Sequence, residues 1–418
     1  MDISSNSNLI DHIFRYEYGK MVSILVHKFG SSQLQNIEDA VHESLIKAMQ
    51  LWPYKGTPKN TTGWLLRVAT NKLIDDIRKD KKLIFSEDVR TFLKDINSKT
   101  HTVELNSVIE DSQLKMIFAC CHPSISQEYQ IILSLKLIGG FSNKEIAKAL
   151  LKKEETIAKG FTRAKKKLSK NIKSLKIPIE LGLRSRVNIV LKIIYLLFSE
   201  GYSATEGEVL IKKDICHEAI RLALLLSKNK YCNRPEVNAL IALMCFHASR
   251  FEARIDENNE LVDLEHHDRS KYDRDLIILG NQYLGYAVEQ SDEPSVYHLQ
   301  AAISYCYSSA RNFDEIDWGS ILEFYDILIR KQRSPSILLN RLISYSKVRG
   351  ANEALKELKV YEKSPNFIDS MLYHAIKSEL LKDLNRIEKS KTALKKAIEK
   401  SNSILEQRYF TKKISQLT

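Results

Sequence analysis

The chain contains few of the residues that interrupt helices. Glycine occurs 14 times and proline 8 times in 418 residues, together about 5% where roughly 12% is usual. Sandwiches, barrels and doubly wound sheets place many glycines and prolines in their turns. The scarcity argues against these folds and predicts an all-α protein.

Cysteines and long apolar runs are also scarce. The six cysteines include no C-x-x-C pair, which excludes a disulfide-dense scaffold or four-cysteine zinc module and fits a reducing cytosol. The N-terminus lacks a basic stretch followed by an apolar run, so no signal peptide is expected. The longest apolar stretch, 187–198, has 12 residues, whereas a membrane span needs about 20. We expect a cytoplasmic protein without membrane contact.

Positive charge is present in excess and is unevenly distributed. Lysine plus arginine is 64 and aspartate plus glutamate is 52, so the formal net charge is +12. Residues 144–176 hold 12 basic and three acidic residues, a local excess of +9, whereas residues 181–418 hold 35 and 32. A local excess of this kind indicates a polyanionic partner.

The basic segment 141–168, FSNKEIAKALLKKEETIAKGFTRAKKKL, also has the strongest local pattern. Ser142 and Glu145 predict a capping box at the start of a short helix. A turn at 151–153 leads to a second helix with an apolar inner face and a basic outer face. This is a helix-turn-helix pattern, whose second helix can enter a DNA major groove. The alternative is a helical hairpin with a solvated lysine face.

Three further helices are expected before this segment, over residues 8–30, 36–51 and 64–79. The second is expected to end before Pro53. Residues 80–111 are mostly polar and lack periodicity, so they are interpreted as a linker between domains. Helical patterning resumes at residue 112 and continues to about residue 173.

Helical patterning also dominates the chain from residue 184 onward. A weak repeat relates Ala354, Leu358 and Tyr361 to Ser390, Leu394 and Ala397, 36 residues later. Helix pairs of about 34 residues are typical of tetratricopeptide repeats, so we predict a TPR-like α-solenoid with a concave face. The expected helices are 187–199, 213–228, 235–250, 271–289, 295–310, 318–331, 335–348, 351–363, 367–382, 386–400 and 403–416.

Two ordered motifs add a family resemblance. Residues 37–52, IEDAVHESLIKAMQLW, resemble the D-x-V-Q-E-x-F-x-x-A-W pattern of sigma factor region 2. Residues 64–82, WLLRVATNKLIDDIRKDKK, resemble the W-L-x-R-I-A-x-N-x-x-x-D-x-x-R pattern that follows it, and the helix-turn-helix resembles region 4. The chain therefore resembles an extracytoplasmic-function (ECF) RNA polymerase sigma factor of the sigma-70 family. Stretches such as 196–204 and 235–250 resemble the subgroup with a long C-terminal TPR-like helical extension.

The resemblance implies five segments along the chain. These are residues 1–82 (sigma region 2), 83–111 (linker), 112–176 (sigma region 4), 177–290 (helical extension) and 291–418 (TPR-like repeats).

The resemblance also implies partners and site residues. The partners are core RNA polymerase, through its β′ and β subunits, and promoter DNA. The positions matching the family's polymerase-binding helix are Asp39, Val41, Glu43, Leu45 and Trp52. For the apolar members, packing in the domain's own three-helix core is the alternative.

DNA-binding positions follow in the same way. The family captures a flipped base of the −10 element at the asparagine ending the second motif, and single-strand phosphates bind nearby. The matching −10 positions are Asn71, Lys72, Arg78 and Lys79, the three basic ones having a solvated helix end as the alternative. The expected −35 positions are Lys159, Thr162, Arg163, Lys165 and Lys166. Arg163 is the candidate base reader, since guanidinium suits guanine, and the lysines are expected to bind phosphates.

Metal, cofactor and catalytic sites are not expected. Cys120, Cys121 and His122 are adjacent and cannot easily converge on one metal, so a buried cysteine pair is the preferred interpretation. The 265–268 tract, EHHD, falls within a family match without metal. The resulting hypothesis is a non-enzymatic sigma factor that a regulatory protein or ligand controls through its C-terminal helical domain. The alternative is a ligand-sensing helix-turn-helix regulator that does not act as a sigma factor.

Overall fold

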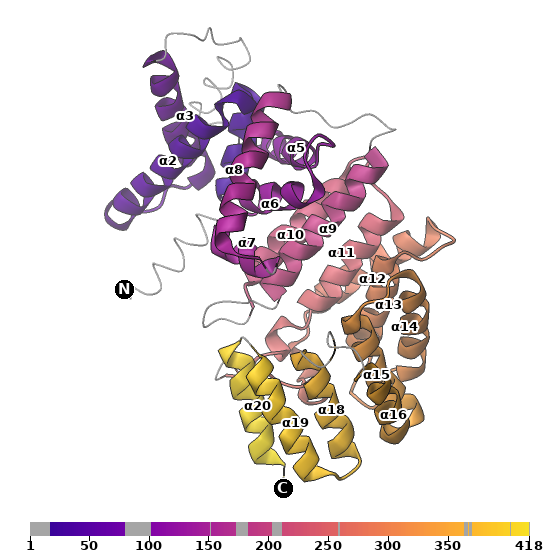
Figure 1. Cartoon of the computed structure of the whole chain (residues 1–418). Coiled ribbons are helices and arrows are strands. Elements are labelled where there is room, and N and C mark those ends of the chain that lie inside the picture. Colours follow the sequence, from indigo (N-terminus) through magenta and orange to yellow (C-terminus); the bar gives the residue numbers. More distant parts are fainter. Residues whose placement is uncertain are drawn as a thin grey trace. The chain divides into compact units, whose positions relative to one another are not determined.

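The structure, a computed structural model, confirms the all-α prediction (Figure 1). It describes residues 17–79, 102–150, 152–172, 183–202, 211–257, 260–362, 367, 370–401 and 403–417. Within these ranges no strand is formed, and one isolated antiparallel bridge joins Ile255 to Leu261. None of the helices in these ranges is long and apolar enough to cross a membrane. Most of the expected linker, 83–101, lies outside the described residues.

The chain divides into two compact units. The first contains the residues up to 197 together with 217–232, and the second contains residues 198–216 and 233–418. The predicted boundary between residues 176 and 177 does not coincide with this division. Most of the first two helices of the extension instead belong to the first unit.

The first unit starts with a helix over residues 17–29 and continues through three elements. They are η1 (Ser31–Gln33), α2 (Leu34–Lys55) and α3 (Thr61–Lys79). Helices α2 and α3 lie side by side. Their facing stripes are apolar at helical spacing, which buries one side of each helix. The buried side chains include Leu34, Ile37, Val41, Leu45, Leu65, Leu66, Ala69 and Leu73.

Helix α2 does not end before Pro53, as the sequence predicted, but continues to Lys55. Proline removes the hydrogen bond to the carbonyl group four residues earlier, here that of Met49. Met49 lies at the surface, 44% exposed, so water can pair with this carbonyl group and the helix can tolerate the proline.

The next four helices lie in the same unit, and the last two of them form the helix-turn-helix. They are α5 (Thr102–Cys120), α6 (Gln127–Leu137), α7 (Asn143–Ala149) and α8 (Glu154–Asn171). Helix α5 begins ten residues earlier than expected, and the sequence already places Leu105, Val108 and Ile109 at helical spacing there. The linker is therefore shorter than predicted.

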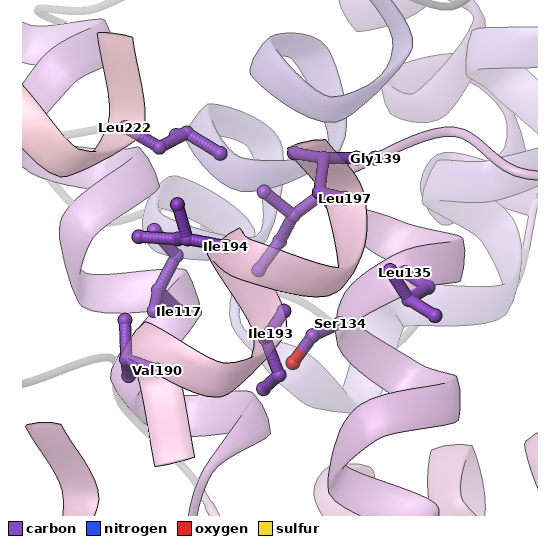
Figure 2. A pocket seen from close by; sticks show the side chains of 10 residues that line it. Ile117, Ser134, Leu135, Gly139, Val190, Ile193, Ile194, Leu197 and Leu222 are labelled. Carbon is purple, nitrogen blue, oxygen red and sulfur yellow. The ribbon is translucent and has the colours of Figure 1, made fainter. Parts of the chain in front are cut away.

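Two further helices complete the first unit. Residues 183–197 of α9 (Leu183–Tyr202) and residues 217–228 of α10 (Lys213–Lys228) belong to it. Figure 2 shows side chains of α9 and α10 beside those of α5 and α6. The remaining ends of both helices belong to the second unit.

The second unit is a succession of paired helices. Most of their starts have capping side chains, such as Asp273, Ser295 and Asp317, each of which accepts a hydrogen bond from a backbone amide of the first turn. The elements are α11 (Pro235–Ala248), η3 (Phe251–Ala253), η4 (Leu264–His266), η5 (Arg269–Lys271), α12 (Arg274–Glu289), α13 (Val296–Ser309), α14 (Trp318–Lys331), α15 (Pro335–Arg349), α16 (Ala351–Tyr361), α18 (Met371–Asp383), α19 (Ile387–Lys400) and α20 (Ile404–Gln416).

The 36-residue repeat corresponds to equivalent places in two of these pairs. Ala354 and Leu358 are fully buried in α16, and their counterparts Ser390 and Leu394 are buried in α19. Each of these helices packs against the helix before it, α16 on α15 and α19 on α18. The sequence repeat therefore reflects a repeated packing position.

The last helix returns to a loop early in the second unit. Lys412 of α20 lies 2.5 Å from the carboxylate of Glu260, and Lys413 lies 3.2 Å from that of Asp263. Tyr409 donates a hydrogen bond to Asp263. Glu260 and Asp263 are thus held by side chains about 150 positions later in the chain.

One glycine marks a close approach within the first unit. A Cβ atom on Gly19 would lie 2.1 Å from the carbonyl oxygen of Ile138, just after α6, whereas one on Gly285 of α12 would meet nothing within 4 Å. We expect Gly19→Ala to lower the free energy of unfolding by about 1–3 kcal/mol through overpacking against backbone. Gly285→Ala, the control, should raise it by up to about 1 kcal/mol.

Urea unfolding monitored by circular dichroism measures both effects. Equal stability of the two variants would contradict the close contact between the first helix and the end of α6.

Candidate nucleic-acid interface

Helix α8 has one buried and one basic face. Ile157, Phe161, Ala164 and Leu168 are buried, as the spacing predicts. Gly160 lies between them, and a Cβ atom there would approach Ile132 to 3.1 Å and Tyr129 to 3.3 Å. Glycine in a helix interior costs about 1 kcal/mol relative to alanine. Here it allows α8 to pack closely on α6.

The start of the helix-turn-helix has the predicted capping box. The backbone amide and the hydroxyl group of Ser142 each donate a 2.8 Å hydrogen bond to Glu145, and the backbone amide of Glu145 donates one to Ser142 Oγ. These bonds pair amide groups that a helix start leaves free. Lys152, in the turn, lies 2.5 Å from Glu128 of α6. The capping box thus closes the start of α7, and the ion pair joins the turn after α7 to α6.

Four of the five side chains expected at the −35 element are exposed on one face of α8. They are Lys159, Thr162, Arg163 and Lys166. The hydroxyl group of Thr162 donates to the carbonyl group of Ala158, and Lys159 pairs with the equally exposed Glu155. Lys167 and Lys170, which the sequence did not single out as site residues, lie on the same exposed side.

Arg163 has a specific neighbour on α6. Its Nη1 atom lies 3.5 Å from the hydroxyl oxygen of Tyr129. The tyrosine ring also packs beneath Gly160. The contact engages one nitrogen of the guanidinium group and leaves most of its five N–H donors available.

Lys165 differs from the other four because it faces the N-terminal helices. Its Nζ atom lies 2.8 Å from Glu38 and 2.6 Å from Gln35, both on α2, and 5.2 Å from the ring centroid of Phe161. The side chains of Lys165 and Glu38 are 19% and 7% exposed. Lys165 therefore forms an internal ion pair in this structure and is not displayed on the basic face.

Glu38 is a buried carboxylate with two partners. Besides Lys165, it accepts a 3.1 Å hydrogen bond from the hydroxyl group of Tyr18. Burial, followed by the charge of Glu38, raises the pKa of Tyr18 well above its usual value. The carboxylate is thus stabilised by one residue of the first helix and one residue of α8.

The α2 residues expected to bind polymerase fall into two groups. Val41 and Leu45 are fully buried against the neighbouring helices, so the core-packing alternative accounts for them. Asp39 is exposed and accepts two 3.2 Å hydrogen bonds from the amide of Gln35. The half-exposed Trp52 makes an edge-to-face contact with Trp64 of α3 at 5.5 Å between ring centroids.

Two other side chains of α2, not expected from the sequence, form an apolar surface strip. Ile46 is 49% exposed and Met49 is 44% exposed. They lie on the same helix face as Asp39 and His42, at spacings of three, four and seven residues. A signal was present in the sequence: two apolar residues interrupt the otherwise polar face of an amphipathic helix.

Glu43 is an expected polymerase-binding residue and Lys72 an expected −10 DNA-binding residue, but the two side chains contact each other. Lys72 Nζ lies 3.0 Å from Glu43 Oε2 and 3.6 Å from Asp76, and Lys47 also pairs with Glu43. Hydrogen bonds from Lys47 and Lys72 lower the pKa of Glu43, and the hydrogen bond to Glu43 raises the pKa of Lys72. Both groups stay charged at neutral pH and partly neutralise each other.

Of the other −10 candidates, Asn71 and Arg78 are exposed on α3. Lys79 is the last residue of α3, and its side chain lies outside the described part of the structure. Asn71 and Arg78 are seven residues apart, so they lie on the same exposed face of α3, two turns from each other.

The cysteine pair 120–121 is buried, as the preferred interpretation holds. Burial raises the pKa of both thiols, that of Cys121 to about 12, so neither is a thiolate at neutral pH. Among the described residues no group of three or more His, Cys, Asp or Glu side chains could hold a metal ion.

Sequence reasoning missed a buried group of arginines in the second unit. Arg254 donates to the carbonyl group of Tyr202, the last residue of α9, and Arg269 donates to those of Tyr307 and Ala310, at the end of α13. Helix C-termini carry partial negative charge, which favours the guanidinium groups of Arg254 and Arg269 at these two helix ends. Arg250, which follows the end of α11, instead contacts His247 Nδ1 at 3.0 Å.

These arginines also determine the charge of two histidines. Burial, with Arg250 and Arg254 next, lowers the pKa of His247 well below its usual value, and the same causes lower that of His267 to about 4. Both imidazoles are therefore neutral at neutral pH. The cluster serves to join helix ends and does not respond to pH near 7.

Comparison with known families gives three matches along the chain. Residues 13–83 match the model of Sigma-70 region 2, residues 115–168 that of Sigma-70, region 4, and residues 186–288 a family of unknown function, DUF6596. An uncharacterized protein of Rhizobium meliloti (strain 1021) is 31% identical over 383 residues, covering 91% of this chain and 89% of that protein. No solved structure matches.

The chain belongs to the sigma-70 family. It is an ECF-like sigma factor with a C-terminal extension. Members of this family are transcription initiation factors and not enzymes. In these terms α2 and α3 belong to region 2, α8 is the second helix of the region 4 helix-turn-helix, and α9 to α12 fall in the matched part of the extension. The Lys165–Glu38 pair thus joins region 4 to region 2.

Replacing Lys165 tests how much the Lys165–Glu38 pair contributes to stability. We expect Lys165→Met to lower the free energy of unfolding by about 1–3 kcal/mol, because it leaves the buried carboxylate of Glu38 without its cation. Lys159→Met is the matched control: its pair with Glu155 is 66% and 76% exposed, so the change should stay below about 0.5 kcal/mol.

Urea unfolding at low and high salt measures the free energy of unfolding of both variants. If both variants lose the same small amount of this free energy, the Lys165–Glu38 pair does not stabilise the protein.

Proposed function

We propose that this sigma factor binds core RNA polymerase through region 2 and directs promoter-specific initiation, with the C-terminal helical domain regulating it. The observation that carries the proposal is the presence of two different surfaces on one chain. Helix α8 displays a basic face suited to a DNA groove, and α2 displays an apolar strip suited to a protein. The protein would act in the cytoplasm, where polymerase and promoters are found.

The polymerase-binding surface of region 2 is best assigned to the exposed face of α2. Asp39 contributes charge at its start, and Ile46 and Met49 supply apolar area. Apolar anchors surrounded by polar groups are typical of protein interfaces. Val41 and Leu45 would support this face from beneath, and Glu43 would act together with Lys72.

The −10 and −35 contacts are proposed on α3 and α8. Asn71, with Arg78 near the end of the same helix, would contact an unpaired base and its backbone. On α8, Arg163 would read a base edge, while Lys159, Lys166 and the neighbouring lysines would bind phosphates. Lys165 would reach DNA only after leaving Glu38.

The alternative function, a ligand-sensing regulator that binds DNA without polymerase, accounts for α8 but leaves the apolar strip of α2 without a role. Run-off transcription separates the two functions. The full chain, added to core polymerase with promoters enriched from genomic DNA, should give discrete transcripts. Absence of any transcript at all salt concentrations, with DNA binding retained, would favour the regulator.

A charge placed in the apolar strip should weaken polymerase binding. We expect Ile46→Asp to reduce the affinity for core polymerase by about tenfold or more, because a carboxylate would be desolvated in the interface. Val360→Asp introduces the same change at a residue of α16 that is 62% exposed, and it should bind like the wild type. Binding of each variant to surface-immobilised core polymerase measures both affinities. Equal binding of the two variants would remove Ile46 from the interface.

Substitutions on α8 should separate base reading from phosphate binding. Arg163→Ala should cost about 1–3 kcal/mol on the cognate −35 sequence and relax specificity there. Lys166→Ala should weaken binding to all sequences alike and reduce the salt dependence. Fluorescence anisotropy on matched and scrambled −35 duplexes measures both. Equal losses for Arg163→Ala on the two duplexes would refute the base-reading role.

A further inference from the structure

Helix α6 of region 4 is buried on all sides. Seven of its 11 residues are buried, including every residue from Gln130 to Leu135. A helix that is buried all round needs covering elements on each side. Helices α5, α7 and α8 of region 4 provide part of this cover.

The extension provides another part of the cover. Figure 2 shows Ile193, Ile194 and Leu197 of α9 beside Leu135 of α6 and Ile117 of α5. Ile117 and Leu135 are 2% and 3% exposed. These side chains come from the extension on one side and from region 4 on the other, and they form a continuous apolar core.

The small hollow among these side chains is a packing gap. Its volume is about 10 Å³ and its lining is almost entirely apolar, with Ser134 as the polar residue. One water molecule needs about this much space and two to four polar partners. The hollow therefore suits no ligand, and the surrounding contacts serve packing.

A buried polar contact joins the same two parts of the chain. Arg221 of α10 donates a 2.7 Å hydrogen bond to the side-chain oxygen of Gln113 of α5. Gln113 is fully buried, and Glu218 holds the arginine at 2.8 Å through both carboxylate oxygens. Without α10, the amide of Gln113 would lose this partner.

We propose that α9 and α10 are structural members of the region 4 domain, so that the start of the extension and the DNA-reading helices fold as one cooperative unit. Both helices continue without interruption into the second compact unit. The extension therefore influences α8 through a shared core and not as a detachable partner. This last consequence rests on the proposed DNA-reading function of α8, whereas the shared core does not.

Hydrogen exchange of the full chain, read by mass spectrometry, tests the proposal without polymerase or DNA. Ile194→Ala removes buried methyl groups from α9, whereas Lys192→Ala changes an exposed residue of the same helix. We expect Ile194→Ala to speed amide exchange in α5, α6 and α8 by at least about tenfold. Lys192→Ala should leave these peptides unchanged. Faster exchange confined to α9, with α5, α6 and α8 as protected as in the wild type, would overturn the proposal.

A second variant keeps the test decisive if Ile194→Ala does not fold. Arg221→Gln removes the charged contact to Gln113 and leaves the apolar core in place, and it should speed exchange in α5 by a smaller factor. No change in α5 would contradict the shared unit. Neither readout involves transcription. If exchange in α5, α6 and α8 responds to these changes but the protein gives no transcripts, only the proposed function is refuted. If the protein gives transcripts but the exchange does not respond, only this inference is refuted.

Discussion

The burial of α6 on all sides over residues 130–135 is the constraint on which the first unit depends. A helix segment with no exposed side cannot be stable by itself, because each apolar side needs a neighbour that excludes water. The apolar face of α8 covers one of these sides, which leaves most of the basic residues of α8 on its opposite face. The basic face is thus a consequence of how α6 is covered, and α9 and α10 contribute to the same cover.

Charge in this chain is informative only after pairing is considered. The local excess of +9 in residues 144–176 indicates a polyanion, but its members are not equivalent. Lys165 neutralises a carboxylate of region 2, and Lys152 is paired with Glu128, while Arg163 and Lys166 remain on the open face. A residue count overestimates the charge that DNA would meet, because some lysines have structural tasks.

Much of the fold was predictable because its signals are local. The expected helices 213–228 and 318–331 agree with α10 and α14, since apolar spacing marks both helices and Asp317 caps the start of α14. The site was less predictable. Periodicity shows that Val41 and Leu45 share an apolar stripe but not whether the stripe packs inside or against a partner. Lys165 lies at the edge of α8, and its partner Glu38 is 127 residues away, so no local pattern could reveal the pair.

The return of α20 to Glu260 and Asp263 has a consequence for the order in which the second unit can fold. Lys412 and Lys413 contact residues that lie about 150 positions earlier in the chain. Contacts across so long a separation are gained only after the entropy of closing the intervening loop has been lost. Although helix pairs of a solenoid can form from local contacts, the contacts of α20 with Glu260 and Asp263 therefore require the helices between them to be already in place.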